Sequence, residues 1–161
     1  MADFDRIIVD FGPALSRVAA AYERDPALKD DLLQEILLAV AQSLPRLKDE
    51  TRLKPFVFRI AHNKGVDHVA RHVAIPKAEE VSEHLPAAEG SPEDRMMQKQ
   101  RAERLMAAVR ALDLPYRQAI TLLMEDLSYA EIADALGITV SNVGVRINRA
   151  KALLRSQIDH G

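Results

Sequence analysis

The sequence predicts an all-α protein made of two small helical domains. Apolar side chains recur at helical spacing on both sides of one proline-rich stretch, residues 76–94, and no segment shows the alternating pattern of a strand. Leu, Ala, Glu, Arg and Gln, which favour helices, dominate the composition. With 161 residues, 48% of them hydrophobic, the chain can bury one core or two small ones.

The proline-rich stretch divides the chain. Its sequence, PKAEEVSEHLPAAEGSPED, holds three prolines, one glycine and six acids against the single Lys77. It lacks a periodic apolar face, so we expect a flexible acidic linker. The expected organisation is an N-terminal domain at 1–75, the linker at 76–94 and a C-terminal domain at 95–161.

Three helices are expected in the N-terminal domain. The first spans residues 3–23, where Pro13 is expected to end or bend it, because proline removes a backbone donor. The second spans 28–44 and the third runs from about 55 to 73. The predicted core positions of the second and third helices are Leu33, Ile36, Leu37, Val40 and Leu44, and then Phe56, Ile60, Val66, Val69 and Val73.

The C-terminal domain begins with helices at 93–112 and 116–126, the latter opened by Pro115. The stretch LSYAEIADALGITVSNVGVRINRAK then predicts two more helices joined by a short turn. Ser128 and Glu131 have capping-box spacing, Gly137 suits a left-handed C′ position, and Thr139 can cap the second helix. In that helix one side is apolar and faces the core, through Val143, Ile147, Ala150 and Leu154.

The opposite side of this last helix is small and polar at its start and cationic later. It carries Ser141, Asn142, Val145, Asn148 and Arg149, with Arg146 on one flank and Lys151 and Arg155 on the other. Two helices joined by a glycine turn, the second cationic, are typical of a helix-turn-helix that places its second helix in the DNA major groove. The alternative is a solvated helical hairpin.

Charge is segregated although the net charge is only -2. Residues 52–72 hold five Lys or Arg against one acid, and residues 141–155 hold four against none. Two cationic segments separated by an acidic one suggest two contacts with a polyanion.

These residues resemble a family. LPYRQAITLLMEDLSYAEIADALGITVSNVGVRINRAKALLR is similar to region 4 of bacterial sigma-70 factors, particularly the extracytoplasmic-function (ECF) group. DDLLQEILLAV and LKPFVFRIAHNKGVDHVAR are similar to region 2 of that group. The two regions and the intervening linker, in this order, cover almost the whole chain.

The resemblance implies a sigma factor that binds core RNA polymerase and directs it to promoters. Region 4 would read the minus-thirty-five element and region 2 would recognise and melt the minus-ten element, with unpaired bases held beside residues 45–54. The implied minus-thirty-five residues are Ser141, Asn142, Val145, Arg146, Arg149 and Lys151. The implied minus-ten residues are Arg59, Asn63, Lys64, Asp67 and Arg71.

A polymerase-binding surface is expected on the second helix. Asp31, Gln34, Glu35 and Leu38 follow i, i+3, i+4, i+7 spacing on the side away from the core. Two carboxylates, an amide and a leucine suit an arginine-bearing partner helix, whereas the simpler interpretation is a solvated face. In the resembled group this surface binds the β′ clamp helices, and region 4 binds the β flap. The resemblance also implies an anti-sigma factor as a further partner.

The sequence departs from the family pattern in two places. Gly144 stands where relatives usually carry lysine, which removes a phosphate contact and costs about 1 kcal/mol of helix propensity. After Asp67 the chain offers HVARHVA instead of a dense arginine run, so melting is expected to be weak or to depend on pH through His68 and His72.

Other functions are less well supported by the residues. His68 and His72 have the spacing of a zinc pair, with Asp67 and His84 nearby, but no metal or other cofactor is expected. No catalytic motif is visible, so we do not expect an enzyme. With no signal peptide or apolar run of membrane-spanning length, we expect a cytoplasmic protein that does not insert into membranes. Two alternatives to a sigma factor stay open, a helix-turn-helix regulator and a sigma-like decoy or adaptor that starts no transcription.

Overall fold

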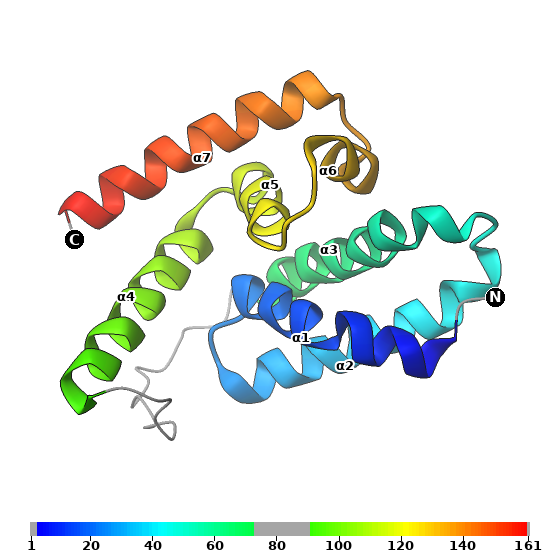
Figure 1. The fold of residues 1–161 in the computed structure, drawn as a ribbon, viewed down its shortest axis with the longest axis horizontal. Coiled ribbons are helices and arrows are strands. Elements are labelled where there is room, and N and C mark those ends of the chain that lie inside the picture. Colours follow the sequence, from blue (N-terminus) through cyan, green and yellow to red (C-terminus); the bar gives the residue numbers. More distant parts are fainter. Residues whose placement is uncertain (1–2, 73–90, 161) are drawn as a thin grey trace.

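The structure, a computed structural model, describes residues 3–72 and 91–160. Within these ranges every regular element is helical, which confirms the predicted all-α class. The N-terminal part contains α1, α2 and α3, with two short 3₁₀ turns before α3 (Figure 1). The bounds are α1 Phe4–Tyr22, α2 Pro26–Ser43, 3₁₀ turns Leu44–Arg46 and Glu50–Arg52, and α3 Leu53–His72. Those of the C-terminal part are α4 Pro92–Ala111, α5 Leu114–Met124, α6 Tyr129–Leu136 and α7 Val140–His160.

Helix α1 runs through Pro13, so the expectation that Pro13 could end the helix is wrong, while a bend there stays a prediction. Proline at this position cannot donate a hydrogen bond to the carbonyl oxygen of Val9. Both Pro13 and Val9 are exposed, so water can bind that carbonyl oxygen in place of the missing amide. The cost of the lost bond is therefore reduced, and the buried side of α1 holds the helix together.

The predicted linker falls largely outside the described residues, as do Val73 and His84. Helix α4 begins at Pro92, with Ser91 as its N-cap accepting a hydrogen bond from the amide of Asp94. The last three residues of the range 76–94 are thus helical. The boundaries 1–75 and 95–161 otherwise stay predictions.

In α3 the face that packs against α1 differs from the predicted one. Phe56, Ile60, Val66 and Val69 are only half-buried, whereas the fully buried residues are Pro55, Val57, Phe58, Ala61, His62, Gly65 and His68. The reason is close approach. A Cβ at Gly65 would lie 2.6 Å from Cδ2 of Tyr22, so α1 and α3 meet at residues too small to stand out in a search for large apolar side chains.

The helical hairpin of the C-terminal part forms as predicted. Ser128 Oγ accepts from the amide of Glu131 and the Glu131 carboxylate accepts from the amide of Ser128, which completes the capping box. Gly137 has φ +69°, the left-handed conformation that glycine adopts without strain. Thr139 accepts from the amide of Asn142 at the start of α7. The apolar side of α7, Val143, Ile147, Ala150 and Leu154, is buried.

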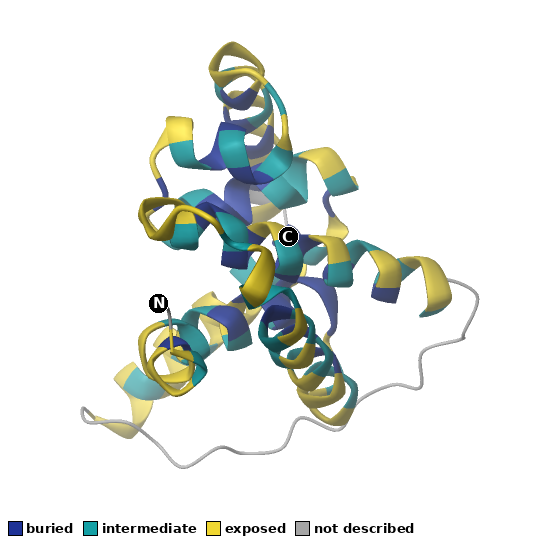
Figure 2. Ribbon diagram, turned by 90° about the vertical axis from the view of Figure 1, so that its right-hand side faces the viewer, coloured by how far each residue is buried: buried dark blue, intermediate teal, exposed yellow. Residues whose placement is uncertain are grey.

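The two helical domains lie against one another. Helix α6 packs on α3, and α4 and α5 pack on α1 (Figure 1). Buried residues continue from one domain to the other through the middle of the molecule, with exposed residues toward its periphery (Figure 2). The sequence indicated two domains but contained no signal for this contact.

Candidate nucleic-acid interface

The polar side of α7 is open to solvent. Ser141, Asn142, Val145, Asn148, Arg149 and Lys151 are all exposed, and Arg146 is half-buried. Nη1 of Arg149 lies 3.5 Å from the Tyr116 hydroxyl of α5. An amphipathic helix with a capped N-terminus, a buried apolar side and a small, polar, cationic outer side can enter a major groove and contact base edges and phosphates.

Gly144 lies on the same part of α7 and has room for a side chain. A Cβ there would meet only Cε2 of Tyr129, at 3.8 Å. Tyr129 opens α6 and is itself partly exposed. Neither packing nor the backbone conformation therefore requires glycine at position 144. Its presence leaves this part of the α7 surface without a charged side chain.

Helix α3 presents a second polar surface. Arg59, Asn63, Asp67 and Arg71 recur every four residues and are exposed, and Lys64 beside them is half-buried. Both arginines already donate hydrogen bonds within the protein. Arg59 donates from Nε to the carbonyl oxygen of Ala135 at 3.1 Å and from Nη2 to that of Asp134, and Arg71 donates from Nη2 to Oε2 of Glu35 at 3.0 Å.

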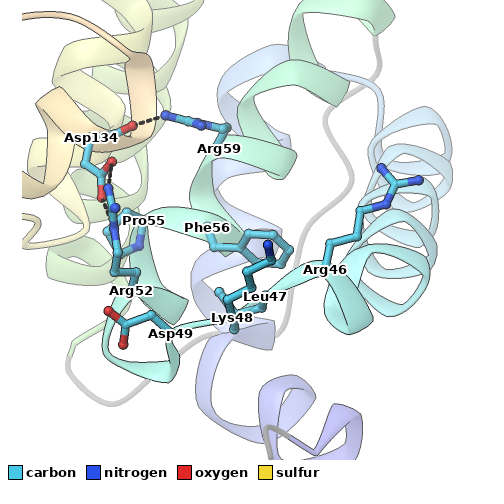
Figure 3. Close-up of a pocket in the computed structure, with 9 residues that line it drawn as sticks. All are labelled: Arg46, Leu47, Lys48, Asp49, Arg52, Pro55, Phe56, Arg59 and Asp134. Carbon is cyan, nitrogen blue, oxygen red and sulfur yellow. Dashed lines mark hydrogen bonds and ion pairs between the residues drawn. The ribbon is translucent and has the colours of Figure 1, made fainter.

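A cavity of about 310 Å³ lies between the segment before α3 and helix α6. It falls at residues 45–54, the segment where the resemblance implies that unpaired bases bind. Figure 3 shows its lining, in which Phe56 lies between Arg46 on one side and Arg52, Arg59 and Asp134 on the other, and Lys48 overlaps the Phe56 ring in this view. An aromatic ring among cations suits an unpaired base with its phosphate.

The side chain of Asp134 closes one side of this cavity. Arg52 donates to it from Nε at 3.2 Å and from Nη2 as well, as the dashed lines in Figure 3 show. The hydrogen bond from Arg52 lowers the pKa of Asp134, against a smaller opposing effect of burial. Next to it, Lys54 Nζ lies 3.7 Å from Oε1 of Glu131. Arg52 and Lys54 were not singled out in the sequence, although they belong to the segment 52–72 with its excess of basic residues.

The expected acidic stripe on α2 is on the surface. Asp31 and Gln34 are exposed, Glu35 is half-buried, and Leu38, on the same side of the helix as these polar residues, is 58% exposed. Glu35 holds Arg71 of α3, so the stripe and the α3 surface are joined by an ion pair. Whether these residues bind polymerase stays a prediction.

The histidines of α3 are directed mostly into the protein. His68 is buried and its Nε2 lies 2.8 Å from Oε1 of Glu23, while His72 stacks on it with ring centres 4.1 Å apart. Burial raises the pKa of Glu23, but hydrogen bonds from His68 and from backbone amides outweigh it, and the net pKa is lowered. In the ranges 3–72 and 91–160, no three acids or histidines form a group that could hold a metal ion.

His62 was missed altogether. Its Nδ1 lies 2.6 Å from the Tyr22 hydroxyl. Burial, together with the positive charge of Arg146 on α7, lowers its pKa to about 4. A lone polar residue on an apolar helix side gives little sequence signal, and here it belongs to the contact between α3 and the C-terminal domain.

Two family models match the chain. Residues 7–74 match the model described as Sigma-70 region 2, and residues 102–154 match that of Sigma-70, region 4. Together the matches cover most of the chain. The described part contains no helix that is long and apolar enough to cross a membrane.

Relatives that match over most of the chain are also named as sigma factors. The chain is 27% identical over 139 residues to RNA polymerase sigma factor SigZ of Bacillus subtilis, covering 84% of this chain and 75% of the relative. It is 26% identical over 148 residues to ECF RNA polymerase sigma factor SigM of the same organism, covering 90% and 88%.

Two solved structures share the fold. One is the sigma factor RpoE in complex with the anti-sigma factor NepR from Bartonella quintana, with TM-score 0.76, 22% identity, and coverage of 99% of this chain and 98% of that one. The other is CnrH in complex with the cytosolic domain of CnrY, with TM-score 0.72, 23% identity, and coverage of 98% and 88%. With regions 2 and 4 matched in order and relatives aligned over most of their length, the chain belongs to the ECF group of the sigma-70 family.

Proposed function

We propose that this protein is an alternative sigma factor, which binds core RNA polymerase and directs it to a set of promoters. The observation that carries the proposal is family membership over both regions together with an open, cationic helix α7. A sigma factor is a transcription initiation factor and needs no catalytic group of its own. Its polymerase and DNA partners locate the proposed activity in the cytoplasm.

Helix α7 is the proposed reader of the minus-thirty-five element. Ser141, Asn142 and Val145 lie on the first two turns, where a recognition helix contacts base edges. Arg146, Arg149 and Lys151 follow on the next turns, where they would contact phosphates or guanines. Their exposure, apart from that of the half-buried Arg146, supports this assignment.

Helix α3 and the cavity beside residues 45–54 form the proposed minus-ten surface. Arg59, Lys64 and Arg71 would hold single-stranded backbone, and Asn63 and Asp67 would contact bases. The four-residue spacing of Arg59, Asn63, Asp67 and Arg71 supports a single continuous surface. The lining of the cavity, with Phe56 among cations, supports capture of an unpaired base.

The acidic stripe of Asp31, Gln34, Glu35 and Leu38 is the proposed polymerase contact, with the β′ clamp helices as partner. Exposure of Leu38 within a polar stripe supports it, since interfaces combine an apolar centre with polar neighbours. The β flap is the proposed partner of the C-terminal domain.

An anti-sigma factor is the proposed regulator. Of the two similar structures described above, one is the sigma factor RpoE in complex with the anti-sigma factor NepR, and the other is CnrH in complex with the cytosolic domain of CnrY. The partner would cover the surfaces that polymerase and DNA otherwise use.

Initiation with purified core polymerase tests the proposal. The protein should co-elute with core polymerase in gel filtration and should make RNA synthesis start at defined positions on a double-stranded template. A helix-turn-helix regulator would shift DNA alone without supporting synthesis, and a decoy or adaptor would co-elute but start nothing. Either of these outcomes would refute the proposed function and support the corresponding alternative.

A further inference from the structure

A further cavity, of about 340 Å³, opens where helix α3 meets α5 and α6. These helices are neighbours in the fold (Figure 1). The lining consists of Arg59, His62 and Asn63 from α3, Gln118 from α5, and Ala135, Leu136 and Gly137 from the end of α6. A volume of this size is typical of sites for small molecules, and four of the seven lining residues have polar side chains.

His62 is the most deeply buried polar residue of this lining, with 3% of its surface exposed. Its Nδ1 lies 2.6 Å from the Tyr22 hydroxyl of α1. Burial raises the pKa of Tyr22 and keeps the phenol protonated, so the hydroxyl donates and Nδ1 accepts. Burial, with the positive charge of Arg146, lowers the pKa of His62 to about 4. At neutral pH the imidazole is therefore neutral and carries its one proton on Nε2.

This Nε2–H group has no acceptor. Within residues 3–72 and 91–160, Nε2 of His62 is one of three buried side-chain polar atoms without a hydrogen-bond partner. Because Tyr22 on α1 binds one edge of the ring, the opposite edge is directed away from α1, toward the cavity that the ring helps to line. A buried donor without an acceptor is costly, so an acceptor oxygen is expected at this point.

The charges next to this donor are positive. Arg59 uses Nε and Nη2 to bind two backbone carbonyl oxygens of α6, and neither bond involves its Nη1. Arg146 of α7 acts on His62 through its charge. Asn63 and Gln118 add amide groups that can donate hydrogen bonds to an acceptor in the cavity.

The end of α6 does not offset these positive charges. The last four carbonyl oxygens of a helix lack donors within the helix and carry a partial negative charge. Here three of the four already accept, two of them from Arg59 and one from the amides of Gly137 and Ile138. The carboxylate of Asp134 is likewise paired with Arg52. The groups that remain to be satisfied in the cavity are therefore donors.

We propose that this cavity binds a small anion whose carboxylate or phosphate oxygen accepts the Nε2 hydrogen of His62. The charges of Arg59 and Arg146 balance the anion, and the Gln118 amide donates to another of its oxygens. A water molecule would satisfy the imidazole but would not balance the two guanidinium charges. The site requires neither polymerase nor a promoter, so it is independent of the proposed function.

A small anion fits this cavity better than a nucleic-acid strand does. His62 is buried whereas Arg59 and Asn63 are exposed, so its donor lies at the inner wall of the cavity. Each phosphate of a strand carries a sugar on both sides, which keeps it at the outer surface. An anion of a few carbon atoms can reach the inner wall without displacing α5 or α6.

Nuclear magnetic resonance of protein labelled with ¹⁵N at its five histidines tests the proposal. The spectrum of His62→Gln identifies the His62 signals by their loss. In the free protein these signals should show a protonated Nε2 and an unprotonated Nδ1. At an ionic strength held constant with sodium chloride, inorganic phosphate or succinate should move the Nε2 signal, with half-saturation below about 10 mM.

The choice of probe separates the sources of the anion. Tighter binding of phosphate would indicate a phosphorylated ligand and tighter binding of succinate a dicarboxylate, and both results support the proposal. Succinamide, the neutral analogue of succinate, should leave the signal in place. An equal response to succinamide, or no response to any probe, would overturn the proposal. A shift caused by a 20-nucleotide oligothymidylate but by neither small anion would assign the cavity to nucleic acid and overturn it as well.

Gln118→Glu places a negative charge in the cavity without changing the size of the side chain. The affinity for the tighter-binding anion should fall at least about tenfold, because like charges repel strongly at this range. Gln98→Glu, the same change at an exposed position of α4 outside the lining, is the matched control and should bind within about twofold of the wild type. Arg146→Gln provides the second variant and should weaken binding at least about threefold. Unaltered affinity in Gln118→Glu, or an equal loss in Gln98→Glu, would show that the anion binds elsewhere.

Discussion

Arg71 of α3 donates a hydrogen bond to Glu35 of α2, with 3.0 Å between Nη2 and Oε2. The pair joins the proposed minus-ten surface to the proposed polymerase-binding stripe. Both side chains are about half exposed, so the pair contributes little to stability and either partner can be drawn away. Binding of polymerase to Glu35 would therefore release Arg71 toward DNA.

Charge reversal at Glu35 tests the polymerase-binding stripe. Glu35→Lys should weaken binding to core polymerase at least about thirtyfold, since reversing a charge at an interface costs roughly 2 kcal/mol or more. Surface plasmon resonance with immobilised core polymerase measures it. Asp30→Lys, at an exposed acid of the same helix outside the stripe, is the control and should bind like the wild type. Unaltered affinity of Glu35→Lys would remove the stripe from the interface.

Restoring a side chain at Gly144 should strengthen DNA binding. The position has room, and Gly144→Lys adds a cation to the exposed side of α7. The slope of log K against log salt for promoter duplex should steepen by about 0.9, the value for one added phosphate contact. Gly144→Ala separates the two effects, because it should gain up to about 1 kcal/mol of stability while keeping the wild-type slope. Identical salt-dependence slopes for the wild type and both variants would show that residue 144 does not lie near the DNA backbone.

His62 makes the fold sensitive to acid. Its pKa falls from 6.5 to about 4 on folding, so between these values the unfolded chain binds the additional proton and stability drops as the pH falls. The free energy of unfolding should decrease by about 3 kcal/mol from this group between pH 6.5 and 4. Urea titrations across this range should show a shallower dependence for His62→Gln than for the wild type. Glu23, whose lowered pKa acts in the same direction, is common to both proteins. If the free energy of unfolding fell equally with pH in His62→Gln and in the wild type, the acid sensitivity would not come from His62.

Gly65 is required by its contact with Tyr22. A methyl group there would lie 2.6 to 2.8 Å from three atoms of the Tyr22 ring, which is buried and whose hydroxyl is hydrogen-bonded to His62. Gly65→Ala should therefore destabilise the fold by about 2 kcal/mol, despite the better helix propensity of alanine. Gly12→Ala is the matched control in α1, where the nearest atom is 3.9 Å away, and it should stabilise by about 0.5 kcal/mol. Equal effects of the two changes in urea denaturation would show that the α1–α3 approach is looser than described.

Local signals predicted the C-terminal hairpin almost completely. Ser128, Glu131, Gly137 and Thr139 act through groups a few residues away, so their spacing determines both caps and the turn. The apolar side of α7 is equally regular, because its buried residues fall on a single side of the helix, which packs on α4, α5 and α6. Prediction of α3 was poorer for the opposite reason. This helix packs on α1 and α2 and also faces α6, and its close approach to α1 occurs at Gly65 instead of at a large side chain.

The contact between the domains was outside the reach of sequence reasoning. Arg52 and Asp134 are far apart in the chain, and each reads separately as an ordinary surface charge. The sequence could not show that α1 continues through Pro13, because proline's cost in a helix depends on whether the carbonyl left without a partner meets water, which only the packing of α1 decides. Residue roles in polymerase and DNA binding rest on the family resemblance and stay predictions.

Mapping the 5′ ends of transcripts tests the central claim most directly. Core polymerase reconstituted with this protein should transcribe the organism's own genomic DNA from a limited set of new start sites, which share one sequence motif near minus ten and another near minus thirty-five. Arg149→Ala, with an exposed α7 arginine removed, should lower transcription from these sites without creating others. Start sites no different from those of core polymerase alone would contradict the account.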